Sequence, residues 1–207
     1  IMLQESAWTG LCFLAGIALN SRLMLVGALI GASSGMVAAK LLRLSSDEEL
    51  YRGLFGFNGA LAGIAVFFFF PPTAHAVILV ILGGALSSVV MRWLLNWGKL
   101  PPYTAPFVIS AWVVLVVAYA LGLSTGVPLG IGRPLGDFAA VVRGVGQVMF
   151  QDNWLSGALF GAGLAACSRE AAAWAVIGSS IGLVTARGLA YPADLAFAGI
   201  FGFNAAL

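Results

Sequence analysis

The stretch LPPYTAPF, residues 100–107, places a hydroxyl group among prolines in a chain that is otherwise strongly apolar. Pro101, Pro102 and Pro106 remove backbone N–H donors and disfavour a regular helix. In a lipid environment, the carbonyls freed in this way must be satisfied by protein, by water or by a passing solute. Thr104 adds a hydroxyl that can both donate and accept a hydrogen bond. The stretch therefore predicts either a polar point on a solute path or an interfacial loop in which Thr104 caps the next helix.

An octapeptide with a polar centre occurs twice, as LFGFNGAL at residues 54–61 and as IFGFNAAL at residues 200–207. Phe57 and Leu61 are four residues apart and share one face of a helix, where a ring and an isobutyl group can form a flat apolar wall. A purely structural Phe–Leu pair is commoner in membrane helices, and the repetition is what favours a functional one. Asn58 points elsewhere, which favours a structural role in binding backbone groups across a repeat interface. The second copy supplies the equivalent Phe203, Asn204 and Leu207.

The composition requires most of the protein surface to face lipid. Hydrophobic residues make up 61% of the chain and charged residues 9%, whereas a soluble domain keeps about a quarter of its residues charged. A spanning helix needs about 20 mostly apolar residues, and the apolar runs approach that length. We therefore expect an all-α polytopic membrane protein. The predicted spans are residues 7–20, 23–42, 53–70, 76–95, 106–122, 154–167, 171–186 and 195–207.

One apolar segment is too short to span a membrane. FAAVVRGVGQVMF, residues 138–150, carries Arg143 in its middle and predicts a half-helix that enters the bilayer part of the way. Within the predicted spans, no Asp, Glu, Lys or His is central, although ion-coupled carriers usually need such a residue. The sequence therefore favours passive permeation.

Several classes of function are excluded by what the sequence contains. A net charge of +2 provides no electrostatic footprint for nucleic acid. Cys12 and Cys167 both lie in apolar segments and are interpreted as packing residues, and His75 is the only histidine. We therefore expect no metal site and no cofactor. Because no nucleophile–base set is present either, we expect no enzyme activity.

An ordered internal repeat relates the two parts of the chain. A constant offset pairs Phe13 with Phe160 and Gly16 with Gly163, and after the loss of one residue it pairs Asn58 with Asn204. The first copy contains an odd number of spans, so the second copy must enter the membrane from the opposite side. We predict a first repeat over residues 1–137 and an incomplete second repeat over 138–207, with its pore helix and first three spans. We therefore expect the sequence to be a piece of a longer protein.

LPPYTAPF, the repeated GFN-x-AL and the segment RGVGQVMFQDN-x-L-x-G at residues 143–157 together resemble the urea transporter family. The resemblance covers essentially the whole chain, and LPxxTxPF is its most specific element. It implies two inverted repeats of five transmembrane helices, each with a tilted pore helix, and one pore in each protomer of a homotrimer. It also implies passive, channel-like transport of urea by a multi-pass protein in the lipid bilayer of the cell membrane, which in a bacterium is the cytoplasmic membrane.

The resemblance carries over to named positions in the pore helix, the narrow slot and the middle of the pore. The residues that it places on the urea path are Gln147, Val148, Phe150, Phe57, Leu61, Thr104, Phe203, Leu207, Ile1 and Leu3. The residues with an expected structural role are Asn58, Asn204, Pro101 and Pro106. The first-repeat counterpart of Gln147 and a second LPxxTxPF are absent from this sequence.

The chemistry of these residues suits urea, which is planar and neutral and has four N–H donors and one carbonyl acceptor. Acceptors can come from carbonyls left free at the end of a half-helix, together with Gln147 and Thr104. Two alternatives remain open. The same fold could pass ammonia, a short amide or water, or the chain could belong to a non-conducting membrane scaffold.

Overall fold

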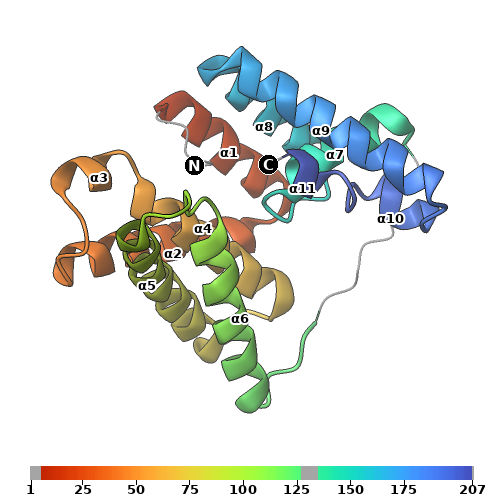
Figure 1. Ribbon diagram of the computed structural model, residues 1–207. Coiled ribbons are helices and arrows are strands. Elements are labelled where there is room, and N and C mark those ends of the chain that lie inside the picture. The colour runs from red at the N-terminus through yellow and green to blue at the C-terminus, as the bar shows by residue number, and fades with distance from the viewer. Residues whose placement is uncertain (1–5, 127–134, 207) are drawn as a thin grey trace. The chain divides into compact units, whose positions relative to one another are not determined.

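The computed structural model describes residues 6–126 and 135–206, and within these ranges the chain is helical and has no strand (Figure 1). The predicted Ile1, Leu3 and Leu207 lie outside the described residues. The helices are α1 (Ala7–Asn20), α2 (Arg22–Leu41), α3 (Asp47–Tyr51), α4 (Leu54–Phe69), α5 (Ala74–Trp97), α6 (Ala105–Ala120), α7 (Asp137–Gln147), α8 (Trp154–Cys167), α9 (Arg169–Gly188), α10 (Ala193–Phe197) and α11 (Phe203–Ala206).

Most of the predicted spans correspond to one helix each. The helices α2 and α5 are long and apolar enough to cross a membrane, and α1, α4, α6 and α8 are shorter apolar helices. The exception is the span predicted over residues 195–207, which is wrong as a continuous helix. There α10 ends at Phe197, and Gly199, with φ of 82°, turns the chain before α11 begins. Glycine adopts this left-handed conformation without the steric cost that a side chain adds.

The helices form two compact units. One contains residues 23–126, and the other contains residues 6–22 together with 135–206. The first helix, α1, therefore packs with the helices of the carboxyl-terminal part of the chain. This grouping reports contacts in space, and the repeat boundary between residues 137 and 138 stays a prediction.

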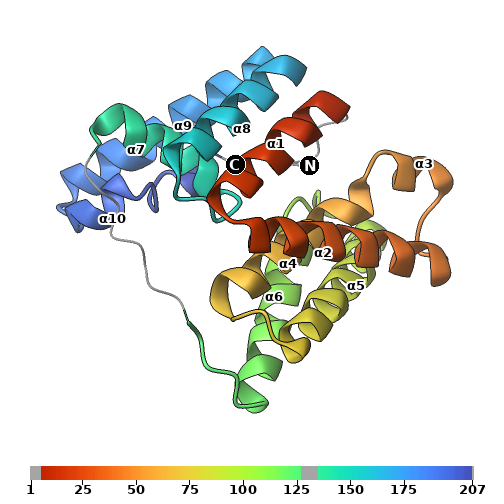
Figure 2. The same cartoon turned by 180° about the vertical axis from the view of Figure 1, so that it is seen from behind.

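Helix α4 forms the centre of the first unit and is buried from Phe55 to Phe67. Its glycines contact α2 without intervening side chains, since a Cβ at Gly31 would lie on the carbonyl of Gly59, and a Cβ at Gly63 on the carbonyl of Gly27. Such close backbone contact between small residues is typical of helix packing in membranes. An apolar cluster joins the carboxyl-terminal end of α4, the start of α5 and the carboxyl-terminal half of α6. The three helices are labelled in Figure 2.

The short helix α3 is fastened to α5 by polar contacts. Ser46 and Glu49 form a reciprocal capping box at its start. Arg92 on α5 donates from Nη2 to Glu49 Oε2 at 2.5 Å and from Nε to the carbonyl of Leu44, and its guanidinium lies 5.5 Å from the centroid of the Phe55 ring. The acidic stretch at residues 47–49 thus begins a capped helix, and Arg92 connects this helix to the first turn of α4.

This arrangement predicts a small acid-dependent loss of stability. The pKa of the Glu49 carboxyl is lowered from 4.5, first by the Ser46 N–H that donates to it and also by Arg92, while partial burial opposes the shift. A lowered folded-state pKa stabilises the fold above pH 4.5, and this contribution is lost as the pH falls through the lower folded-state value. Because both side chains are partly exposed, we expect an effect below about 1 kcal/mol.

Thermal unfolding of the purified protein between pH 7 and pH 3 measures this effect. We expect Glu49→Gln to lower the midpoint near neutral pH and to reduce its fall on acidification. Glu48→Gln changes the same charge on the neighbouring residue and is the matched control. An unchanged acid-dependent fall in Glu49→Gln would contradict the assigned contact.

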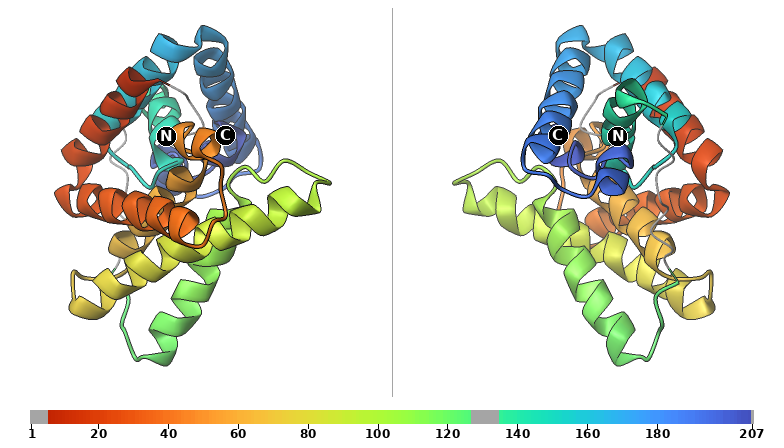
Figure 3. Two further views of the ribbon diagram at one scale, coloured as in Figure 1. Left: turned by 90° about the vertical axis from the view of Figure 1, so that its left-hand side faces the viewer. Right: turned by 90° about the vertical axis from the view of Figure 1, so that its right-hand side faces the viewer.

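In the second unit, α1 and α8 lie side by side in both views of Figure 3. The Thr9 hydroxyl donates to the carbonyl of Gly163 at 2.8 Å, and the Ser156 hydroxyl donates to the carbonyl of Gly16 at 2.7 Å. Residue numbers rise along α1 as they fall along α8, so the two helices are antiparallel. Each helix therefore supplies one hydroxyl and one glycine carbonyl to the contact.

An aromatic pair is buried between the same two helices. The rings of Phe13 and Phe160 meet edge to face with centroids 4.7 Å apart, and both residues are fully buried. Edge-to-face pairs of this kind contribute beyond the area they bury. The aromatic pair lies between the two hydroxyl–carbonyl hydrogen bonds, and together the three contacts fix how α1 packs on α8.

Candidate functional site

The proline-rich segment interrupts the helical structure of the first unit, as the sequence predicts. It is non-helical from Pro101 to Thr104, and α6 begins at Ala105. Tyr103 has a φ of 41°, in the left-handed region that residues with a side chain rarely adopt. Thr104 occupies the N-cap position of α6, but its side chain makes no capping hydrogen bond. The described structure therefore does not support the alternative in which Thr104 serves as the cap of this helix.

Asn58 on α4 binds the backbone of this segment on both sides of Thr104. Its Nδ2 donates to the carbonyl of Tyr103 at 3.2 Å, and its Oδ1 accepts from the N–H of Phe107 at 3.0 Å. The residue is 1% exposed. The sequence prediction placed the backbone partners of Asn58 across the repeat interface, whereas the observed partners belong to the same unit. These two bonds connect α4 to the start of α6.

The predicted wall residues lie on the same helix. Phe57 and Leu61 are buried on α4 with exposed fractions of 4% and 1%. Their counterpart Phe203 is partly buried at the start of α11, and Asn204, the counterpart of Asn58, is exposed. In the first unit, Phe57 and Leu61 lie on α4, and Thr104 lies at the start of the neighbouring α6. That these residues line a path for the solute stays a prediction.

The segment predicted as a half-helix over residues 138–150 contains the 11-residue α7 (Asp137–Gln147) in the second unit, and its partial entry into the bilayer stays a prediction. After Gln147 the chain turns, with Met149 N–H donating to the carbonyl of Gly146 and Phe150 N–H to that of Gln147, both at 3.0 Å. Val148 is buried, and Phe150 has a φ of 60°. The helix therefore ends in a tight turn at the residues that the resemblance places on the solute path, and that placement stays a prediction.

Two side chains one turn apart on α7 bind the end of α10. Arg143 donates from Nη1 to the carbonyl of Phe197, and Gln147 donates from Nε2 to that of Ala198, both at 3.0 Å. Carbonyls at a helix end need such donors because they have no intrahelical partner. Within the described part of the chain, the Gln147 side-chain oxygen has no hydrogen-bond partner. The amide is thus held through its nitrogen and keeps its acceptor available.

The contact made by Arg143 was not assigned from sequence. The available signal was a cation in the middle of an apolar half-helix, four residues before Gln147. Arg143 is 7% exposed, and a charge at that depth requires polar partners. The structure provides the carbonyl of Phe197 as one of them.

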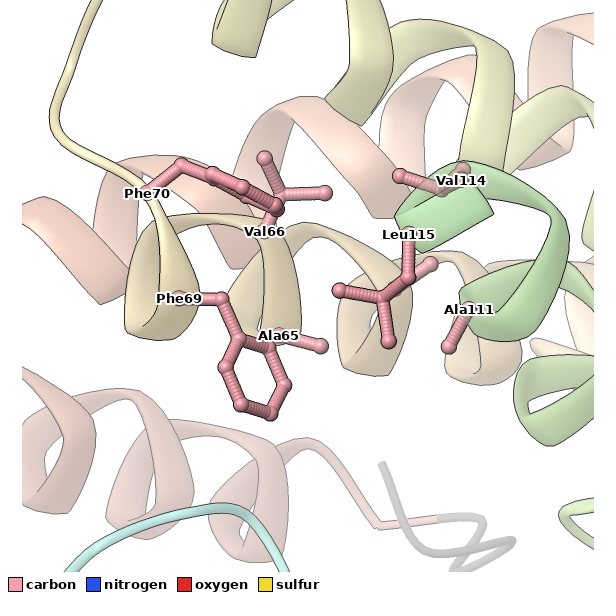
Figure 4. Close-up of a pocket in the computed structure, with 8 residues that line it drawn as sticks. Ala65, Val66, Phe69, Phe70, Ala111, Val114 and Leu115 are labelled. Carbon is pink, nitrogen blue, oxygen red and sulfur yellow. The ribbon is translucent and has the colours of Figure 1, made fainter. Parts of the chain in front are cut away.

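A small apolar pocket lies between α4 and α6. In Figure 4 it is lined by Ala65, Val66 and Phe69 on α4, by Phe70 directly after this helix, and by Ala111, Val114 and Leu115 on α6. Its volume of about 10 Å³ is room for about one water molecule. The lining side chains are all apolar, so the pocket offers no side-chain acceptor to the N–H groups of urea. It is a feature of helix packing that sequence reasoning did not predict.

The described residues are helical, two of the helices are long and apolar enough to cross a membrane, and the helical structure is broken at Thr104 and after Gln147, as expected of a multi-helix membrane protein. Comparison with known families specifies this further. The urea transporter family model matches residues 1–207, and the chain belongs to this family. The family consists of membrane-embedded transporters and not of enzymes, which confirms the prediction that the chain has no enzyme activity.

Individual relatives of this chain are also named as urea transporters. The chain is 26% identical over 225 residues to urea transporter 1 of Rattus norvegicus, and 25% identical over 222 residues to urea transporter 1 of Ovis aries. Each alignment covers 96% of this chain and 56% of the relative. The chain therefore spans a little over half the length of the curated relatives it matches.

Proposed function

We propose that this chain forms part of a passive, channel-like urea transporter. The observation that carries this proposal is the match of the urea transporter family across the whole chain. The relatives that it matches are called urea transporters. The protein would lie in the cell membrane as a multi-pass homotrimer, with urea as the transported solute and lipid around it.

The contacts between α1 and α8 support an inverted repeat. The sequence pairs Thr9 with Ser156, Gly16 with Gly163 and Phe13 with Phe160. In the structure each hydroxyl binds the glycine carbonyl of the other copy, and the two rings meet between these bonds. Reciprocal contacts of this kind are the signature of a two-fold axis. Because the helices are antiparallel, the axis is perpendicular to them, as for repeats inserted in opposite directions.

The lengths of equivalent helices support the same repeat. Both α1 and α8 have 14 residues, and both α2 and α9 have 20. In both copies the first helix ends at a serine in extended conformation, Ser21 and Ser168. The two segments thus follow the same local course from equivalent sequences.

The polar groups of the site support a path for a solute rich in N–H donors. The Thr104 hydroxyl makes no capping bond, and the Gln147 oxygen has no partner among residues 6–126 and 135–206. Both are acceptors next to breaks in helical structure, where backbone carbonyls are also released. We propose that these acceptors bind urea N–H groups in turn, while Phe57, Leu61, Phe203 and Leu207 form the apolar walls. Val148, Phe150, Ile1 and Leu3 would supply further positions along the path.

Urea influx into liposomes tests the proposal. The full-length protein is reconstituted, and flux is followed by stopped-flow light scattering against protein-free vesicles. We expect rapid flux that saturates little and is unaffected by ionophores. Thr104→Val and Gln147→Leu each remove one acceptor and should lower the flux about five- to tenfold, the value of one hydrogen bond of about 1 kcal/mol or slightly more.

Thr185→Val makes the same threonine substitution outside the predicted path and should leave the flux unchanged. Urea flux no faster than that of bare lipid, from correctly folded protein, would overturn the urea assignment. Flux of ammonia, a short amide or water in its place would identify the alternative solute. Absence of all of these fluxes would favour the scaffold alternative.

A further inference from the structure

The amino-terminal end of α6 is capped by a residue from another helix. An N-cap side chain ordinarily accepts a hydrogen bond from the N–H of the second or third helical residue. In α6 the second residue is Pro106, which has no N–H, so the third, Phe107, supplies the remaining donor. That N–H donates to Oδ1 of Asn58 at 3.0 Å, although Thr104 stands at the N-cap position.

We propose that Asn58 is a positioning residue that caps α6 from α4 and thereby leaves the Thr104 hydroxyl available to the solute. This inference rests on the proposed function, since it concerns the same path. Asn58 thus affects transport only through the position and availability of the Thr104 hydroxyl. The Asn58 amide is oriented by its two backbone partners, Tyr103 and Phe107, so we assign it no direct contact with the solute.

The second bond of Asn58 fixes the other side of Thr104. Nδ2 donates to the carbonyl of Tyr103, whose φ of 41° is a conformation that needs support from its surroundings. One amide therefore binds the carbonyl of Tyr103, before Thr104, and the N–H of Phe107, after it. The backbone of Thr104, which carries the hydroxyl, is therefore held in place on both sides.

Removing the amide changes which acceptor Phe107 can use. Without Asn58 Oδ1, the Phe107 N–H lies at the start of a helix whose N-cap residue carries a hydroxyl. Threonine is a favoured N-cap residue because its oxygen can accept this bond. The Thr104 oxygen then accepts from its own helix, which occupies one of its two lone pairs and fixes the hydroxyl toward the helix instead of the solute. In the intact protein the two residues thus divide capping and solute binding between them.

A double-mutant cycle tests this coupling by urea influx into liposomes containing the full-length protein. We expect Asn58→Ala and Thr104→Val each to lower the flux about five- to tenfold, and the double variant to lower it no further than either alone. Two independent effects would multiply to a loss of about 25- to 100-fold. Asn58→Asp keeps an acceptor for Phe107 but replaces the donor to the Tyr103 carbonyl with a second oxygen, so we expect it to lower the flux at least as much as Asn58→Ala.

Ser87→Ala is the matched structural control. Its buried hydroxyl donates to the carbonyl of Gly84 within α5 at 2.7 Å, a bond that includes none of residues 103–107. We expect a lowered unfolding midpoint with unchanged flux per folded protein. Multiplicative losses in the cycle, or full flux in Asn58→Ala, would overturn the inference even where wild-type urea flux upholds the proposed function. If Asn58→Ala does not fold, Asn58→Ser takes its place, since its shorter hydroxyl cannot replace both arms of the amide.

Discussion

Replacing Gly63 with valine is expected to prevent the first unit from reaching its folded state. A Cβ at Gly63 would lie on the carbonyl of Gly27, and it would also be 3.2 Å from Val80 Cγ1. The obstructing atoms on α2 belong to the backbone, so no side-chain rotation relieves the contact. Inserting carbon atoms into packed interiors costs about 1–3 kcal/mol even where side chains can adjust. We expect a loss above that range, seen as a collapse of folded yield and of the unfolding midpoint.

Gly10→Ala and Gly161→Ala are the controls for this substitution. Both glycines are helical and have no atom within 4 Å of an added Cβ. Alanine is the better helix former by about 1 kcal/mol, so these variants should be as stable as the parent or slightly more so. A well-folded Gly63→Val protein with an unchanged midpoint would contradict the close packing of α2 on α4.

Replacing Phe57 with alanine is expected to relax size selectivity. If the Phe57 ring forms one wall of the proposed slot, its removal widens the slot by several carbon atoms. One methylene of fit in an apolar pocket changes discrimination by about tenfold or more. We therefore expect the flux of methylurea relative to urea to rise about tenfold, measured by stopped-flow light scattering on the same vesicles.

Phe67→Ala separates this effect from general loss of packing. Phe67 lies on the same helix with 6% exposure and belongs to the apolar cluster at its far end. Deleting either ring should destabilise the protein by about 3–5 kcal/mol, but only Phe57→Ala should change the flux ratio. An unchanged ratio in Phe57→Ala would remove Phe57 from the proposed path.

Much of the secondary structure was predictable because it follows from local composition. The spans predicted over residues 7–20 and 154–167 agree with α1 and α8 at both ends. Their apolar runs are bounded by side chains that cap helices, since Ser6 accepts from Thr9 and Asn153 accepts from Leu155. Capping and hydrophobic length act within a few residues, so a sequence pattern reports them directly.

The segment over residues 195–207 shows where local reasoning failed. Its residues are apolar enough for a span, yet the structure turns at Gly199. A Cβ at this glycine would meet the backbone of Arg143 and Gly144 on α7. The turn thus depends on a neighbour distant in the sequence, and hydropathy contains no information about that neighbour.

The sequence by itself determined the class of protein, most of its helices and the two polar breaks that carry the candidate acceptors. It also indicated that Asn58 is structural. Only the tertiary structure decided what Asn58 binds, because its partners Tyr103 and Phe107 lie 45 and 49 residues away. Such bonds form only when α4 packs against α6 and brings an amide to the end of another helix. The same packing decides that Thr104 stands at a cap position without capping, since a hydroxyl's availability depends on which competing acceptor lies within reach.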